Sequence, residues 1–309
     1  MTINWFPGHM HKARKEITAI LPKVDFLIEL VDARIPYSSG NPLIAELRDQ
    51  KPLLKLLNKS DLADPVVTQT WIEYFEAENG VKAIPFDARN AQHARQLLHR
   101  GAKLVGREPN PLKPITTMVV GIPNVGKSTL INGMVGRAVA QTGNVPAVTK
   151  RQQRIAVDQN YILLDTPGFL WPKLWPATCG YRLAVTGAIK DAIVDYADIA
   201  WFAADFLRAE YGEAVSERYR LDELPDDATL LLEEIARRRG CIGKGGVVRT
   251  EQVSELLIRE LRAGRLGKLS LETPDVIEEE VRLATLEKAR LEEEKRLKKE
   301  LRQQKKRRR

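Results

Sequence analysis

The segment from Gly121 to Ser128 reads GIPNVGKS and matches the pattern G-x-x-x-x-G-K-[ST] of a phosphate-binding loop. An apolar segment precedes it and a helix-compatible segment follows, which is the context this loop requires. Its glycines permit a tight turn whose N–H groups point at phosphate oxygens, and the following helix N-terminus favours anions. Lys127 would reach the β- and γ-phosphates, and the Ser128 hydroxyl would bind Mg²⁺. The other contacts predicted here are Asn124, Val125, Gly126 and Thr129.

A second segment, Asn58 to Asp61, reads NKSD and matches the guanine-reading pattern N-K-x-D. The Asp61 carboxylate can accept hydrogen bonds from N1–H and from the exocyclic amine of guanine. Adenine offers neither donor, so a buried carboxylate would be left unpaired. Asn58 would contact the N7 side of the base, and the Lys59 stem would lie against its plane. Alone, this tetrapeptide is equally typical of a strand-to-helix turn; beside a phosphate loop it predicts a guanine nucleotide.

A third segment, Asp165 to Gly168, reads DTPG at the end of an apolar strand. Asp165 would hold Mg²⁺ through a water molecule, and the Gly168 N–H would contact the γ-phosphate and so sense hydrolysis. Alone, the tetrapeptide is also typical of a type I or II turn. Thr149 lies between the phosphate loop and Asp165, at a distance suited to a switch threonine that closes on Mg²⁺. Other threonines lie nearby in the sequence.

A fourth, weaker element follows another predicted strand at Asp87 and Ala88. GTPases usually carry Ser-Ala at this place, where the backbone touches the guanine oxygen. Asp87 replaces the serine here, while Ala88 can still serve through its backbone N–H.

These loops must be positioned by a sheet, and the chain predicts one. Apolar runs that read as strands alternate with helical stretches, which indicates an α/β fold with a mainly parallel sheet covered on both faces. The predicted strands are Val24–Asp32, Pro52–Leu57, Val81–Phe86, Ile115–Val120, Arg154–Asp158 and Tyr161–Asp165; the predicted helices include Asn41–Asp49, Val66–Asn79 and Ala91–Gly101.

Beyond Gly168 the chain shows no convincing strand, and we expect a smaller all-helical domain. Its predicted helices are Ala188–Leu207, Ala228–Arg239 with Gly240 as the C-terminal left-handed residue, and a third that Thr250 caps and that ends before Gly264. Pro274 opens a charged tail that ends in KKRRR. The sequence thus predicts a GTPase domain at 1–171, a helical domain at 172–272 and a basic tail at 273–309.

The composition favours a polyanionic partner. The 309 residues carry a net charge of +8, with a sequence pI of about 9.4, which favours nucleic acid over an anionic membrane surface. The only cysteines, Cys179 and Cys241, have no near neighbour at metal-ligand spacing and are read as ordinary thiols. No segment resembles a signal peptide or approaches the roughly 20 apolar residues of a membrane span. We therefore expect a cytoplasmic protein.

The order of the loops is unusual. An ordinary small GTPase has the phosphate loop first and the guanine reader late, whereas here the reader comes first. This is a circular permutation, which a parallel sheet tolerates because the loops gather at the carboxyl ends of its strands. With these motifs in this order, the chain resembles the YlqF/RbgA family of ribosome biogenesis GTPases. The resemblance also rests on Asn4–Met10 (NWFPGHM) and Val31–Pro36 (VDARIP).

The resemblance implies a circularly permuted P-loop GTPase fold with a helical C-terminal domain. It also implies an enzyme that hydrolyses GTP to GDP and phosphate, slowly alone and faster on a ribosomal subunit. Hydrolysis would be coupled to a late step in assembly of the large subunit. The implied partners are ribosomal RNA and the large-subunit precursor, with neither DNA nor a membrane expected.

The same resemblance bears on catalysis and on a monovalent ion. Phe169 and Leu170 follow Gly168, where many GTPases place a glutamine that orients water. His9 is then a candidate for positioning or deprotonating water, and the alternative is that it is structural or contacts RNA. Asn124 matches the position that binds K⁺ in related GTPases, where the ion replaces an arginine finger.

Basic residues of the second half are candidates for RNA binding. Arg237–Arg239 with Gly243–Gly246 suits phosphate contact, but it is equally typical of a helix C-terminus followed by a flexible loop. Arg259, Arg262, Arg265 and Lys268 would extend such a patch. The tail from Lys295 to Arg309 would add affinity beside a polyanion, or would be a solvated, disordered end.

Two other functions fit the same residues. A GTP-dependent switch for a non-ribosomal protein partner would share the nucleotide motifs, and salt-sensitive cosedimentation with large-subunit precursors separates the two. An RNA-binding module with a vestigial nucleotide site is disfavoured by the intact Lys127, Ser128 and Asp165. A measurement of GTP turnover excludes it or establishes it.

Overall fold

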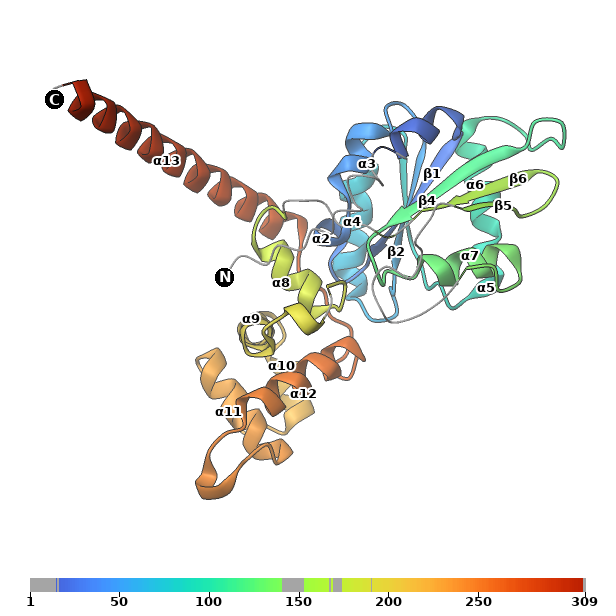
Figure 1. Ribbon diagram of the computed structural model, residues 1–309. Coiled ribbons are helices and arrows are strands. Elements are labelled where there is room, and N and C mark those ends of the chain that lie inside the picture. The colour runs from blue at the N-terminus through green and yellow to red at the C-terminus, as the bar shows by residue number, and fades with distance from the viewer. Residues whose placement is uncertain are drawn as a thin grey trace.

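The computed structural model describes residue 15 and the ranges 17–140, 153–166, 168, 174–189 and 191–307. Figure 1 shows a sheet with helices packed on it, a group of helices beside it, and one long helix, α13, that projects from the rest. Among the described residues, none of the helices combines the length and the apolar character needed to cross a membrane.

The first half is built on a sheet with the strand order β3-β2-β1-β4-β6-β5. Neighbouring strands are parallel except for β5, which runs antiparallel to β6. All residues of β1, β2 and β6 are buried, as expected for strands covered on both faces. The predicted mainly parallel sheet is therefore confirmed. The strands are β1 Phe26–Asp32, β2 Leu53–Asn58, β3 Val81–Pro85, β4 Ile115–Gly121, β5 Gln153–Ala156 and β6 Tyr161–Asp165.

The helices of this half begin at local capping signals. Asp64 caps α4, because its Oδ1 accepts from the Val66 N–H at 2.8 Å, and Pro65 occupies the first helical position. The predicted helix over Ala91–Gly101 is two helices that meet at Arg95. The elements are η1 Leu21–Lys23, α2 Pro36–Ser39, α3 Pro42–Leu47, α4 Pro65–Glu76, α5 Ala91–Ala94, α6 Gln96–Val105 and α7 Lys127–Val135.

The second half is helical, as predicted. Its helices pack around α9, which contacts α8, α10, α11 and α12. In the described part after β6, the strand-like pairing is a single isolated bridge between Ile242 and Val248. The elements are α8 Thr178–Val185, η2 Asp191–Ile193, α9 Tyr196–Glu210, α10 Gly212–Tyr219, α11 Ala228–Arg239, η3 Lys244–Gly246 and α12 Thr250–Arg262.

Two predictions about these helices are wrong in detail. The helix expected over Ala188–Leu207 begins at Tyr196, because Asp195 caps it through the Ala197 N–H at 2.9 Å and a separate 3₁₀ turn precedes it. Thr250 is the first helical residue of α12 and not its cap; the cap position belongs to Arg249, which makes no side-chain capping bond. By contrast, α11 and the left-handed Gly240 lie where the sequence places them.

The charged tail forms a helix, α13 Pro274–Arg307, and Figure 1 shows it leaving the molecule. Its beginning packs against the first half: Ile277 is buried with Trp71 of α4. From there to residue 300 the helix is mostly exposed, with ion pairs one turn apart such as Arg282–Glu279 at 2.6 Å. Such pairs stabilise a solvated helix, so the alternative of a disordered end does not describe residues up to 307.

The segment between α12 and α13 returns to the first half. The Leu269 N–H donates to the Leu62 carbonyl at 2.9 Å, and the Leu271 N–H donates to the Arg34 carbonyl at 2.8 Å. Glu272, fully buried, accepts from the Ser38 N–H at 2.9 Å and from the Ser38 hydroxyl. The loops after β1 and β2 are thus hydrogen-bonded to the segment that follows α12. The division at 171/172 and 272/273 stays a prediction.

Candidate nucleotide-binding site

The sheet brings the predicted loops to one edge. Asn58 ends β2, Gly121 ends β4 and Asp165 ends β6, and all three strands run in the same direction. Asp87 and Ala88 follow β3, the next parallel strand. The carboxyl ends of parallel strands meet at the same edge, which is where α/β folds bind ligands. Segments that lie far apart in the chain are therefore neighbours.

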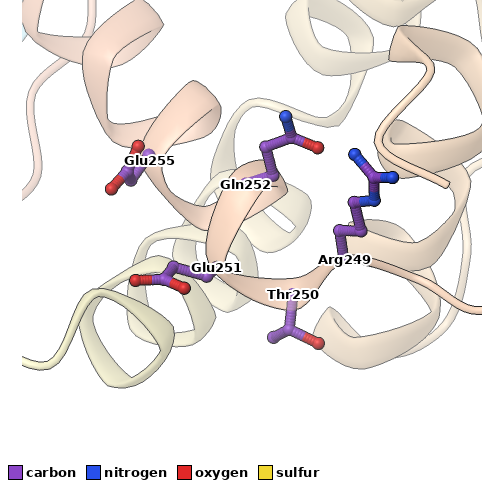
Figure 2. A pocket seen from close by; sticks show the side chains of 5 residues that line it. All are labelled: Arg249, Thr250, Glu251, Gln252 and Glu255. Carbon is purple, nitrogen blue, oxygen red and sulfur yellow. The ribbon is translucent and has the colours of Figure 1, made fainter. Parts of the chain in front are cut away.

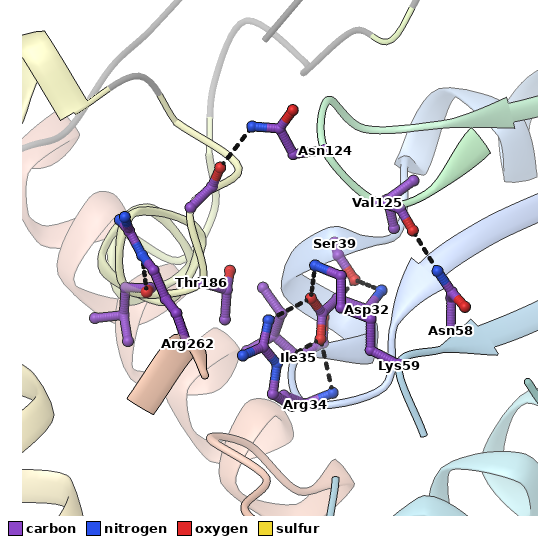
Figure 3. Close-up of polar contacts among 12 residues, drawn as sticks. Asp32, Arg34, Ile35, Ser39, Asn58, Lys59, Asn124, Val125, Thr186 and Arg262 are labelled. Atoms are coloured by element: carbon purple, nitrogen blue, oxygen red, sulfur yellow. Dashed lines mark hydrogen bonds and ion pairs between the residues drawn. The ribbon is translucent and has the colours of Figure 1, made fainter. Parts of the chain in front are cut away.

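Asn58 ties three of these loops together. Its Nδ2 donates to the Val125 carbonyl at 2.6 Å, and its Oδ1 accepts from the Ala88 N–H at 2.8 Å. The side chain is buried, and a Cβ at position 126 would lie 2.4 Å from Asn58 Nδ2, so only glycine fits there. Figure 3 shows the contact with Val125. Asn58 acts here as a link between loops, and its contact with guanine N7 stays a prediction.

Lys127 is a buried cation at the start of α7. It is 8% exposed, and its Nζ donates to the carbonyls of Gly121 and Ile122 at 3.0 Å each. Burial lowers the pKa of Lys127 to about 8, although the Asp165 carboxylate opposes that shift. A phosphate beside Nζ would restore the charged form. The surroundings therefore suit an anion, as the phosphate loop requires.

Ser128 and Asp165 supply oxygen atoms for a cation near this lysine. Ser128 lies half-buried in the first turn of α7, and Asp165, at the end of β6, is 1% exposed. A hydroxyl and a carboxylate are ligands that Mg²⁺ prefers, with phosphate oxygens supplying others. The residues present fit the ion, which would neutralise charge on the transferred phosphoryl group.

Gly168 lies directly against the phosphate loop. A Cβ at this position would be 2.7 Å from Lys127 Nζ and 3.1 Å from the Pro123 backbone nitrogen. The third predicted segment is therefore within reach of the cation that would hold the γ-phosphate. Three positions of the predicted site lie outside the described residues: His9, Thr149 and Pro167.

We predict that Gly168→Ala lowers the affinity for a non-hydrolysable GTP analogue about 10-fold, or about 1.4 kcal/mol. The added methyl group would displace Lys127 Nζ and press on Pro123, at the place where a γ-phosphate would lie. The affinity for GDP should change by about 3-fold at most, because GDP lacks that phosphate. Fluorescence titration with both nucleotides measures this. An equal loss for GDP and the analogue would contradict the assigned position of Gly168.

The guanine-reading loop has a partner that sequence inspection missed. Arg89 Nη2 donates to Asp61 Oδ2 at 2.6 Å, and Asp87 holds the same guanidinium at 2.7 Å. These bonds to Arg89 lower the pKa of Asp87. Asp87 thus holds the arginine that contacts Asp61. The predicted contact of Asp87 with the base stays a prediction. The spacing of Asp87 and Arg89, two residues apart in one loop, is a sequence signal that could have predicted their ion pair.

Asn124 connects the phosphate loop to the helical half. It has a left-handed backbone, with φ of 58°, and its Nδ2 donates to the Gly187 carbonyl at 2.9 Å. Gly187 follows α8, and Arg262 of α12 holds the neighbouring Val185 carbonyl at 2.9 Å. Figure 3 shows these contacts beside the loop after β1. The predicted K⁺ contact of Asn124 stays a prediction.

Comparison with known proteins finds similarity along most of the chain. Residues 116–231 match a family model described as 50S ribosome-binding GTPase. The chain is 46% identical over 287 residues to ribosome biogenesis GTPase A of Priestia megaterium, covering 90% of this chain and 99% of that protein. It is 35% identical over 246 residues to mitochondrial ribosome-associated GTPase 1 of Bos taurus, covering 75% and 74%. The GNP-bound crystal structure of YlqF from T. maritima superposes with a TM-score of 0.59 at 27% identity, covering 86% of this chain and all of that one.

Proposed function

Because this chain belongs to the family of ribosome biogenesis GTPase A, a circularly permuted GTPase, we propose that it binds the large ribosomal subunit precursor through ribosomal RNA. GTP hydrolysis would then drive a late step in assembly of that subunit. The observation that carries this proposal is a likeness that spans both halves, since the alignment covers 99% of a relative named for ribosome biogenesis. The proposal also includes Mg²⁺ with the nucleotide, and K⁺ at Asn124.

The individual site roles form part of the proposal. Asp61 would read the guanine edge, Lys127 would hold the β- and γ-phosphates, and Gly168 would sense the γ-phosphate. Ser128, Thr149 and Asp165 would serve Mg²⁺, and His9 would position water. The contacts around Asn58 and the burial of Lys127 support the first three roles. Chemistry on the nucleotide needs the site residues to lie together, and the shared edge at which β2, β4 and β6 end supports this for the loops of Asp61, Lys127 and Asp165.

The arginines at the end of α11 are largely engaged with neighbouring residues. Arg237 pairs with Glu233 at 3.1 Å, and Arg238 pairs with Asp222 at 2.7 Å. The Arg239 guanidinium lies 5.2 Å from the Tyr219 ring centroid. Of the two interpretations left open, these contacts favour arginines that complete a helix C-terminus.

Other basic residues of the helical half are better placed for RNA. Lys244, Arg249, Arg259 and Lys268 are exposed, and within the described part of the chain none of them forms an ion pair with a carboxylate. Arg249 and Arg259 line adjoining hollows along α12 that share Gln252 and Glu255. Figure 2 shows Arg249 and Gln252 extending from the N-terminal end of α12. Exposed cations beside a hollow suit the phosphate backbone of RNA.

We predict that replacing Lys244, Arg249 and Arg259 together by alanine weakens binding to large-subunit precursors. Three lost phosphate contacts should lower the slope of log affinity against log salt by about 2 to 3. Cosedimentation at several KCl concentrations measures that slope. Arg282→Ala is the matched control, because this exposed arginine is paired with Glu279 on α13. A slope unchanged in the triple variant would contradict the proposed RNA face.

GTP turnover provides the second arm of this test. The proposal expects turnover that rises when large-subunit precursors are added. A protein that hydrolyses GTP but neither binds nor responds to precursors would instead be a switch for a different partner.

A further inference from the structure

We propose that Asp32 and Arg34 position Lys59 for guanine recognition, so that the loop after β1 sets nucleotide affinity without touching the nucleotide. This inference rests on the proposed guanine site. Neither residue matches a nucleotide motif in the sequence; both belong to the segment DARIP. The structure places them beside the guanine-reading loop, because β1 and β2 are paired with Asp32 opposite Asn58.

The three side chains form one cluster of charges around the buried Asp32 carboxylate. Asp32 Oδ2 accepts from Lys59 Nζ and from Arg34 Nη2, each at 2.8 Å. Asp32 Oδ1 accepts from Arg34 Nε at 2.9 Å and from the Arg34 backbone N–H at 3.1 Å. Figure 3 shows Arg34 and Lys59 converging on this carboxylate. Asp32 and Arg34 are each 2% exposed, so the carboxylate that receives the lysine is itself held rigidly.

The backbone around the cluster is held as well. The Asp32 N–H donates to Ser39 Oγ at 2.8 Å, and the Ala33 N–H donates to the Asn58 carbonyl at 2.7 Å. The Arg34 carbonyl accepts from the Leu271 N–H of the helical half. Burial alone would raise the pKa of Asp32, but the charges of Arg34 and Lys59 hold it well below its ordinary value. The acceptor for Lys59 is therefore charged and fixed in place.

Lys59 is the member of the cluster that reaches the base. Its backbone is left-handed, with φ of 61°, an uncommon conformation for a residue with a Cβ. Its side chain is 27% exposed, whereas both Asp32 and Arg34 are shielded. With Nζ held by Asp32, the position of the methylene stem is restricted before the nucleotide arrives, and the stem can pack against the purine plane. Fixing a long side chain in advance removes an entropic cost that binding would otherwise include.

The chain contains a second ion pair between β1 and β2, which does not lie at the edge of the sheet where the nucleotide loops gather. Glu29 and Lys55 lie opposite each other on the same two strands, and Lys55 Nζ donates to Glu29 Oε2 at 2.6 Å. This pair is also buried, at 1% and 9% exposure, but it lies three residues before the edge where the nucleotide loops gather. The Asp32–Lys59 and Glu29–Lys55 pairs each join an acid of β1 to a lysine on or directly after β2. A substitution of Glu29 therefore shows how much of any effect comes from folding and how much from nucleotide binding.

The test measures dissociation constants for GDP and IDP in the full-length protein with Asp32→Asn. We expect both to rise about 10-fold, with their ratio unchanged, because the lysine stem contacts the ring plane and not the exocyclic amine. Glu29→Gln should lower the melting temperature and leave both constants unchanged. Unchanged GDP affinity in Asp32→Asn would overturn the proposal.

A double-mutant cycle shows whether Asp32 acts through Lys59. Lys59→Met keeps the stem but removes the amine, and alone it should weaken GDP binding about as much as Asp32→Asn. Combining the two should add little further loss; additive losses would overturn the proposal. If Asp32→Asn does not fold, Lys59→Met alone decides, since wild-type affinity in that variant is incompatible with the positioning role. Failure of the guanine site itself would look different, because the wild-type protein would then not prefer GDP over ADP.

Discussion

Replacing Lys127 by alanine should lower the affinity for GTP and GDP by about 100-fold or more, which corresponds to about 3 kcal/mol. The lysine is the buried cation of the phosphate loop, and its Nζ lies beside the position of Gly168. Calorimetric titration measures the loss, and GDP should no longer raise the melting temperature. Lys82→Ala is the matched control: it removes the same charge from β3, where the lysine is exposed and paired with Glu76. Retained affinity in Lys127→Ala would contradict the phosphate-loop assignment.

The same variant should lose a pH dependence of stability. Burial lowers the pKa of Lys127 from 10.5 to about 8 in the folded, nucleotide-free protein. Between these values the unfolded chain binds more protons, so the free energy of unfolding should rise with pH from about 8 toward 10.5. At neutral pH the buried charge costs about 3 kcal/mol in order of magnitude, so Lys127→Ala should fold despite the volume that it loses. Denaturant titrations at pH 7 and pH 9.5 measure the difference.

Replacing Asp61 by asparagine should weaken GTP binding by about 100-fold and strengthen binding of xanthine nucleotides. Two charge-assisted hydrogen bonds to the guanine edge would be lost, at about 1.5 kcal/mol or more each. The asparagine amide presents a donor that suits the 2-oxo group of xanthine. Within the described ranges Asp61 forms its ion pair with Arg89, whose side chain is 70% exposed, so the substitution should leave the fold intact.

Competition between GTP and XTP measures that change in preference. Asp205→Asn, in the helical half, carries the same change of charge and should leave the preference untouched. Unchanged base preference in Asp61→Asn would contradict the guanine-reading role of this residue.

Local signals were sufficient to predict most of the first half. Its strands are continuous apolar runs because both faces are covered, and the loops that follow them carry the nucleotide motifs. Capping residues mark helix starts in this half, such as Asn41 and Asp64. These features depend on residues close together in the chain, and the predicted strand and helix bounds therefore differ from the structure by only a few residues.

Features that depend on distant contacts were not predictable in the same way. The start of α9 was misplaced because the apolar pattern runs on through residues 188–195, while the chain there makes a turn after the left-handed Gly187. Helix α8 was missed: its Arg182 is buried through contacts with Glu280 at 2.7 Å and with the Leu271 carbonyl at 2.9 Å. The sequence around Arg182 gives no sign of these distant partners.

The candidate site shows the same division. The phosphate loop and the guanine reader were identifiable as short patterns, but the Asn58 contacts join segments 30 and 67 residues apart. Asp32 was noticed only as part of a family segment, because its role depends on the pairing of β1 with β2. The link between Asn124 and Gly187 joins the two halves and leaves no local pattern.

Amide hydrogen exchange of the full chain with GDP, and separately with ADP, tests the central claim most directly. We expect GDP to slow exchange at Asn58–Asp61, at Asp87–Ala88 and at Gly121–Ser128 together, and ADP to slow none of them at the same concentration. Protection confined to Gly121–Ser128, or equal protection by ADP, would show that these segments do not form one guanine-nucleotide site.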